Sequence, residues 1–314
     1  MKKQLLSSAI LLTTACLWGV AFVAQVFGVR YLDAYTFNAS RFLLGAVALI
    51  PVCLVFERDH PNGAQIKGTL LGGLAAGSVM FAAALLQQCG MELVPNPGKA
   101  GFITGTYTVL TPILYFLFLK KRSGVQIWIG GVLAMAGLYL LCFDGAFGFV
   151  FGAGEALILI GAIFWALHIL VIDHFVSRVS PLKFSCAQFF VCGGLNLIVA
   201  FLFGAPTWEA VGNGMGAILF CGLLSTGVGY TGQIIGQRMS ASPTRAAILL
   251  STESVFSVLG GVVWNLLPLD ESLRVDAHLN GYGILGCVVI MAAILLSQLP
   301  SKAERRQSAR AGNT

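Results

Sequence analysis

Ten apolar stretches, each long enough to cross a membrane, occupy most of this sequence. The hydrocarbon core of a bilayer requires roughly 20 consecutive apolar residues in a helix, because each residue adds about 1.5 Å. Composition agrees, since 57% of the residues are hydrophobic and 10% are charged, whereas a soluble domain carries about 25% charged residues. We therefore predict an all-α polytopic membrane protein. The predicted transmembrane helices are 5–27, 36–56, 68–88, 100–119, 125–143, 152–172, 181–203, 214–235, 244–267 and 280–299.

Basic residues between these spans predict which side of the membrane each loop faces. An excess of Lys and Arg marks the cytoplasmic side, and 15 of the 19 basic residues fall on the side of the N-terminus. Three others, Arg30, Lys99 and Arg274, fall on the opposite side. We therefore expect a multi-pass protein of the inner (plasma) membrane, surrounded by lipid, with both termini in the cytoplasm. The segment 300–314 is expected to be a basic cytoplasmic tail.

The net charge of +6 is also a feature of proteins that bind nucleic acid. Such proteins carry a basic stripe on a soluble domain, whereas the basic residues here lie in short loops and tails, so we expect no nucleic-acid partner. Six of the eight cysteines fall in apolar stretches, where Cys acts as a small apolar side chain. Cys89 and Cys142 fall at helix ends on the predicted outer side, where a disulfide is chemically possible.

The two halves of the sequence match each other at a nearly constant offset. Trp18 pairs with Trp165 at 147 residues, and Gln87 pairs with Gln233 at 146 residues. We therefore predict two repeats, 1–145 and 150–299. Each repeat has five helices, an odd number, so the second repeat enters the membrane from the opposite side. Inverted repeats of this kind build secondary transporters, which alternate access to a site near the membrane midplane. A duplication that only builds a stable bundle is the alternative.

Aromatic and polar residues of the first and sixth spans form one candidate solute-binding wall. Trp18 and Trp165 each lie beyond the middle of their spans, although Trp usually prefers the membrane interfaces. Phe22 and Gln25 share a helix face with Trp18, and His168 shares one with Trp165. Packing against neighbouring helices is the alternative for all of them, and a lone histidine also fits a hydrogen-bonded structural role. The further candidates for this wall are Tyr107 and Tyr230.

Two glutamines lie on helix faces that otherwise carry small residues. Gln87 in the third span and Gln233 in the eighth follow glycines at steps of three and four, which predicts close helix packing. Packing explains the glycines but not the amides, because an amide in hydrocarbon needs polar partners. A polar role facing a cavity is one hypothesis for both. Thr104 and Thr108 share a face of the fourth span ahead of Pro112, where they either cap a kink or contact a solute.

Two charged residues lie inside predicted spans. Glu253 is the only acidic residue near the middle of a span, and a carboxyl group at that depth by default marks an ion or substrate path. We predict a coupling role for it, of which proton coupling is one form; a hydrogen-bonded Glu that fixes the helix is the alternative. Arg41 lies about five residues from the outer end of its span, so we expect its side chain to snorkel to the interface. An anion-attracting vestibule is the alternative for Arg41.

No motif of an enzyme or of a cofactor site is present. The sequence lacks HExxH, GxSxG and the GxxxxGK[ST] phosphate-binding loop, which are signatures of metalloproteases, serine hydrolases and nucleotide-binding proteins. No metal-ligand spacing surrounds His168. We therefore expect no catalysis, no metal, no cofactor and no direct use of ATP. A small-molecule solute is the expected partner, and the oligomeric state is left open.

Three segments of the sequence carry motifs of a known family. Leu-Trp-Gly at 17–19 is similar to that family's opening Trp-Gly, and Lys-Ala-Gly-Phe-Ile-Thr-Gly at 99–105 is similar to its fourth-helix signature. Ser-Pro-Thr-Arg-Ala-Ala at 242–247, which leads to Glu253, is similar to its ninth-helix signature, although the family usually has Glu-Pro where this chain has Glu253-Ser254. The chain therefore resembles the drug/metabolite transporter superfamily, specifically its ten-helix EamA-type permeases.

This resemblance implies a basket of helices around a central cavity and movement of small organic solutes, often amino acids or other metabolites, usually outward. We therefore predict a secondary transporter that exports such metabolites across the inner membrane by alternating access. One alternative is an importer of a vitamin or nucleotide-like metabolite. Another is a channel-like or structural membrane partner.

Overall fold

Every regular element of the computed structural model, which describes residues 2–57, 62–141, 151–204, 206–240, 242–268 and 270–299, is a helix. The first half contains α1 (Lys2–Tyr31), α2 (Ala34–Phe56), α3 (Gly63–Leu93), α4 (Pro97–Gly105), α5 (Tyr107–Leu119) and α6 (Val125–Leu141). The second half contains α7 (Ala153–Phe175), α8 (Pro181–Phe203), α9 (Trp208–Asn213), α10 (Met215–Leu219), the π-helix η1 (Phe220–Tyr230), α11 (Thr231–Met239), α12 (Pro243–Leu250), α13 (Glu253–Leu266), the 3₁₀ turn η2 (Glu271–Leu273) and α14 (Gly281–Gln298).

These helices confirm the prediction of an all-α polytopic membrane protein. Eight spans in the described residues are long and apolar enough to cross a bilayer, counting α4–α5, α10–η1–α11 and α12–α13 as one span each. The other two predicted spans correspond to the shorter apolar helices α6 and α14. The sequence did not predict that three spans consist of more than one helical segment.

The surface and the interior have the polarity expected of a protein in lipid. Large apolar side chains such as Leu54, Phe56 and Phe201 are exposed on the outside of the bundle. Polar side chains such as Asn38, Gln88 and Ser254 are fully buried inside it. A soluble protein hides apolar groups and exposes polar ones, whereas in lipid the polar groups must find their partners within the protein.

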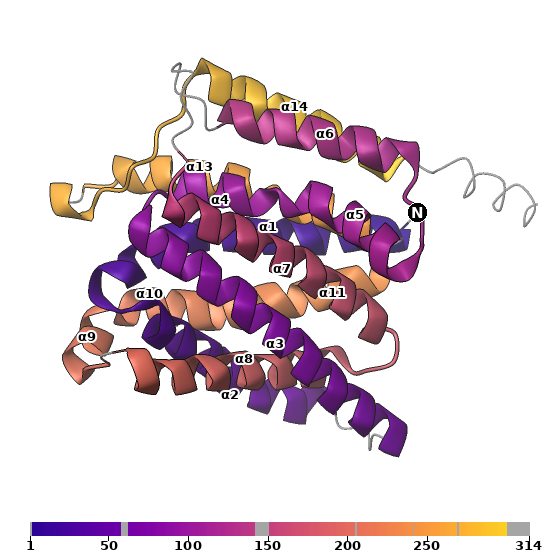
Figure 1. Ribbon diagram of the computed structural model, residues 1–314, viewed down its shortest axis with the longest axis horizontal. Helices are drawn as coiled ribbons and strands as arrows, with labels where there is room; N and C mark the ends of the chain where they lie inside the picture. The colour runs from indigo at the N-terminus through magenta and orange to yellow at the C-terminus, as the bar shows by residue number, and fades with distance from the viewer. Residues whose placement is uncertain are drawn as a thin grey trace, which may run out of the picture.

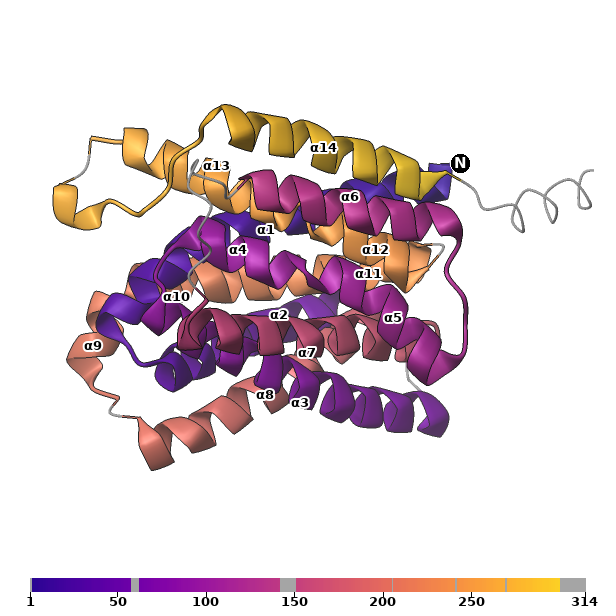
Figure 2. The same cartoon turned by 45° about the horizontal axis from the view of Figure 1, so that its top comes forward.

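Equivalent helices of the two halves make equivalent contacts. In the first half α3 packs against α7 and α8, and in the second half η1 packs against α1 and α2. Likewise α1 packs against α13 while α7 packs against α4 and α5, and the last spans α6 and α14 pair with each other. Figures 1 and 2 show α6 and α14 side by side along one edge of the bundle, and the start of α1 and the end of α14 at the same end.

Glycines permit the closest of these helix crossings. At the contact of α6 and α14, a Cβ added to Gly137 would lie 2.8 Å from the carbonyl oxygen of Gly286, and a Cβ added to Gly286 would lie 2.5 Å from that of Gly137. At the contact of α3 and α8, a Cβ on Gly77 would lie 2.7 Å from the carbonyl oxygen of Gln188. The third and eighth spans therefore pack closely, as predicted, and each packs against helices of the opposite half. Among the described residues, these two spans share no extensive contact with each other.

The fourth and ninth spans are interrupted at equivalent positions. The hydroxyl of Thr106 donates to the carbonyl oxygen of Ile103 at 2.7 Å, and the hydroxyl of Thr252 donates to that of Leu249 at 2.7 Å. These two threonines lie 146 residues apart, as the repeat requires. Because hydroxyl groups compete for carbonyl oxygens that the helix would otherwise use, the chain makes a tight turn at both places. The break precedes Pro112 by a full turn and more, so that proline is not at the interruption.

Candidate functional site

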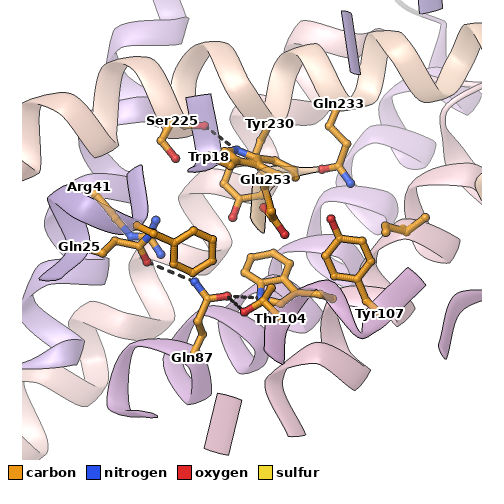
Figure 3. A pocket seen from close by; sticks show the side chains of 13 residues that line it. Trp18, Gln25, Arg41, Gln87, Thr104, Tyr107, Ser225, Tyr230, Gln233 and Glu253 are labelled. Atoms are coloured by element: carbon orange, nitrogen blue, oxygen red, sulfur yellow. Dashed lines mark hydrogen bonds between the residues drawn. The ribbon is translucent and has the colours of Figure 1, made fainter. Parts of the chain in front are cut away.

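A cavity inside the bundle brings together most of the residues that the sequence singled out (Figure 3). In this conformation its free volume is about 30 Å³, room for about one or two water molecules, so a larger solute can enter only when the surrounding helices move apart. The predicted residues that line it are Trp18, Gln25, Gln87, Thr104, Tyr107, Trp165, Tyr230, Gln233 and Glu253. Its other lining residues are Phe22, Arg41, Ile169 and Ser225. Their role in binding stays a prediction.

The cavity lies where the two repeats meet, because its lining residues come in repeat-related pairs. Trp18 and Trp165 form one such pair, and Gln87 and Gln233 form another. Tyr107 and Glu253 form a third, 146 residues apart, although one is a phenol and the other an acid. A site between inverted repeats is the location at which both repeats can change its access.

The interrupted spans bring the third pair to the cavity. Tyr107 is the first residue of α5 and Glu253 is the first residue of α13, so each directly follows a break. The two side chains point toward each other in Figure 3. Glu253 also lies in the first turn of its half-helix, where the helix dipole favours a negative charge. At both places the backbone keeps helical dihedral angles and is bonded through the turn by hydrogen bonds three residues apart, so each break is a short 3₁₀ tightening of the helix.

The amide of Gln87 connects several lining residues. Its Nε2 donates to Oε1 of Gln25 at 3.2 Å, and its Oε1 accepts from Nε1 of Trp165 at 2.7 Å and from Oγ1 of Thr104 at 3.3 Å. This network gives the buried amide the partners that a polar group needs away from water. It also fixes one face of the cavity, with Trp165 held in place by its ring nitrogen.

Aromatic rings form another face of the cavity. The rings of Trp18 and Tyr230 lie 4.5 Å apart between centroids, and Trp165 stacks on Tyr230 at 5.8 Å. Nε1 of Trp18 donates to the carbonyl oxygen of Ser225 at 3.1 Å, inside the π-helix η1. A carbonyl group of this π-helix therefore orients the tryptophan ring at the cavity.

The expectation that Arg41 snorkels to the interface is wrong. Its side chain is 2% exposed and lines the cavity, and its Nε donates to Oδ1 of Asn38 at 2.8 Å. Snorkelling requires a helix face that points to lipid, whereas this face of α2 is covered by η1, with Gly222 directly over the carbonyl oxygen of Arg41. The sequence interpretation used depth alone and did not include the rotation of the helix.

Two predicted residues do not line the cavity. His168 is fully buried, and its Nε2 lies 3.0 Å from Oε1 of Gln188 on α8. Thr108 is also fully buried, directly after Tyr107. Adjacent residues of a helix point about 100° apart, so only one of the two can face the cavity. Ile169 and Ser225 line it without having been predicted; the repeat offset of 147 from Phe22 would have indicated Ile169.

Several polar atoms at the cavity have no hydrogen-bond partner among the described residues. They are Nη2 of Arg41, Oη of Tyr107, Oε1 of Gln233 and Oε1 of Glu253, although Tyr107 and Glu253 lie close enough to interact with each other through these groups. Each buried polar atom without a partner costs about 1–3 kcal/mol, so these atoms are expected to bind water or the polar groups of a solute. No group of three His, Cys, Asp or Glu side chains within the described residues is arranged to hold a metal ion. Cys142 lies outside the described residues, so its pairing with Cys89 stays a prediction.

Proteins from archaea and bacteria are similar in sequence to this chain along nearly its whole length. An uncharacterized transporter of Archaeoglobus fulgidus is 27% identical over 92% of this chain and 87% of its own. The uncharacterized transporter YwfM of Bacillus subtilis is 26% identical over 91% of this chain and 94% of its own. A solved crystal structure has the same fold, with a TM-score of 0.73 at 19% identity over 96% of this chain and 98% of the other.

The family model of the EamA-like transporters matches the sequence twice, at residues 6–143 and 152–299. The two matches agree with the equivalent helix contacts of the two halves and with the pairs of residues that line the cavity. The resemblance found in the sequence motifs is thereby confirmed. The chain belongs to the EamA-like transporter family of the drug/metabolite transporter superfamily.

Proposed function

We propose that this transporter is a secondary transporter that exports small organic metabolites, such as amino acids, across the plasma membrane by alternating access. The observation that carries the proposal is the cavity between the two repeats, lined by unpartnered polar atoms and by the starts of two half-helices, α5 and α13. The outward direction follows from the family resemblance, and the excess of basic residues on the side of the N-terminus supports cytoplasmic termini.

In this mechanism the solute binds between the aromatic rings and the polar groups of the cavity. We expect these two spans to bend at Thr106 and Thr252, because hydrogen bonds three residues apart replace part of the regular α-helical pattern there. The equivalent contacts of the two repeats allow two related states, one open to each side. Glu253 has the coupling role, with a proton as the coupling ion. No step requires a bond to be made or broken in the solute, so we expect no catalysis.

Reconstitution of the purified protein in liposomes tests this proposal. Liposomes loaded with an unlabelled amino acid are placed in a trace of the labelled one, and uptake by exchange is measured against concentration for a panel of amino acids, vitamins and nucleotides. Saturable exchange of at least one amino acid is expected. Exchange confined to vitamins or nucleotides would favour the importer alternative, and flux that rises linearly without saturation would favour a channel.

A further inference from the structure

Arg41 introduces a positive charge beside the cavity, and the described part of the chain supplies no negative partner for it. Its Nε bonds to Asn38, while its Nη2 is buried without a hydrogen-bond partner. The ion pair found among the described residues joins Lys99 and Glu155 instead. A guanidinium group is charged under all physiological conditions, so this charge cannot be removed by loss of a proton.

The groups around Arg41 are neutral. Its guanidinium lies over the ring of Phe42, 4.4 Å from the ring centre. Among the described residues, the thiols of Cys192 and Cys221 and the hydroxyl of Tyr230 lie within electrostatic reach of it, and all three are weak acids. Figure 3 shows Arg41 at one side of the cavity and Glu253 nearer its middle, and Tyr230 is within reach of both.

A buried charge without a counter-ion is strongly unfavourable, which raises the question of what neutralises Arg41. The guanidinium plane matches the two oxygens of a carboxylate, and it can form two parallel hydrogen bonds with them. Asn38 holds Nε and thereby fixes the plane of the group, while Nη2 remains available at the cavity. The counter-ion is therefore expected to arrive with the solute.

We propose that Arg41 is the residue that selects the solute by binding its carboxylate, and that the opposite end of the solute carries an ammonium or another hydrogen-bond donor that faces Glu253. The solute is then a small zwitterion or carboxylate rather than a neutral or phosphorylated compound. This proposal rests on the proposed function, because it concerns the same cavity, but it assigns a role to a residue outside the predicted site.

Matched pairs of acids and amides test the subsite. Melting of the purified full-length protein in detergent is measured with glycine, leucine and phenylalanine, each as the free acid and as its primary amide, and with acetate and inorganic phosphate. A ligand that binds only the folded protein adds RT ln(1 + [L]/Kd) of stability and so raises the melting temperature more the more tightly it binds. At least one acid is expected to stabilise the protein more than its amide does, and Arg41→Gln is expected to weaken that binding by about tenfold or more.

Two further variants distinguish recognition from a structural role. Arg30→Gln removes a positive charge from the exposed end of α1 and is expected to keep the preference for the acid. Arg41→Lys keeps the positive charge but lacks the planar guanidinium group. This variant is expected to retain part of the preference for the acid over the amide. In the absence of ligand, Arg41→Gln is expected to melt at or above the wild-type temperature, because an uncompensated buried charge has been removed.

Other outcomes would overturn the proposal. Equal stabilisation of the wild type by acid and amide would contradict a carboxylate subsite, as would a preference for the acid that persists in Arg41→Gln. Stabilisation by phosphate alone would exclude the carboxylate class. Saturable exchange of an amide or neutral solute in liposomes would overturn the role of Arg41 and leave the proposed function standing, whereas the absence of both stabilisation and flux would overturn both.

Discussion

At the scale of single residues, some polar groups of the cavity make hydrogen bonds to several neighbours. Others lack a hydrogen-bond partner within the described part of the chain. Gln87 has three side-chain partners around its amide. Glu253, by contrast, has an oxygen without a partner among the described residues. We therefore expect substitutions of these two residues to affect different properties, stability for Gln87 and transport for Glu253.

Glu253→Gln is expected to impair transport without unfolding the protein. The amide has nearly the same shape as the carboxyl group but cannot carry a charge or exchange a proton, so a coupling role is lost while packing is kept. Net solute uptake driven by an imposed pH gradient across the liposome membrane should fall by about tenfold or more, a barrier increase of about 1.4 kcal/mol, and the melting temperature without ligand should change little. Glu209→Gln, on the exposed helix α9, is the matched control. Normal saturable flux in Glu253→Gln would contradict the coupling role.

Gln87→Ala is expected to destabilise the protein by about 1–3 kcal/mol, because it leaves Gln25, Thr104 and the ring nitrogen of Trp165 without their common partner. Thermal unfolding in detergent measures the effect. Gln4→Ala, at the exposed start of α1, should have almost none. If both variants melted at the same temperature, the network around Gln87 would not contribute to stability.

At the scale of helices, small residues and hydroxyl groups determine how the spans approach each other and where they break. A helix contact in lipid has no hydrophobic driving force, so close packing of small residues and interhelical hydrogen bonds hold it together. The contact of α6 and α14 depends on two glycines that face each other's backbone. This pair lies at the edge of the bundle (Figure 2), where few other contacts can compensate for its loss.

Gly137→Ala is expected to destabilise the pairing of α6 and α14. Its new methyl group would lie 2.8 Å from the carbonyl oxygen of Gly286, so the helices must separate, and overpacking of this kind costs about 1–3 kcal/mol. Gly194→Ala on α8 is the matched control, because nothing lies within 4 Å of its added Cβ. Since Ala favours helix over Gly by about 1 kcal/mol, the control should melt at the same temperature or higher. Equal destabilisation of both variants would show that the close approach of α6 and α14 does not limit the stability of the protein.

At the scale of the whole molecule, the two halves build one bundle with equivalent contacts, and the start of α1 and the end of α14 lie at one end of it (Figure 1). The connection between α13 and α14, which contains η2, lies at the opposite end (Figure 1). An inverted repeat requires this arrangement, because five helices carry the chain from one side of the membrane to the other. The distribution of Lys and Arg then predicts which end faces the cytoplasm.

Reporter fusions check this orientation. A reporter active only in the cytoplasm, fused after residue 299, is expected to be active, since most of the basic residues lie on that side. The same reporter inserted next to Asp270, before η2, is expected to be inactive, and a reporter that needs the outer compartment should give the reverse result. Activity of the cytoplasmic reporter at both positions would show that α14 does not cross the membrane.

The sequence by itself determined the class of fold and the family, and it predicts ten spans and an internal repeat. These are properties of local composition and spacing, because crossing a bilayer requires a fixed length of apolar chain and a repeat conserves its register. The depth of a residue in the membrane can likewise be counted along its helix. This count singled out Glu253, Gln87 and the two tryptophans. Only the tertiary structure decided which of the buried residues share a cavity. Arg41 lines it and His168 does not, because the direction of a side chain depends on how each helix is rotated about its axis by the helices packed around it, and that rotation is set by contacts between residues far apart in the sequence.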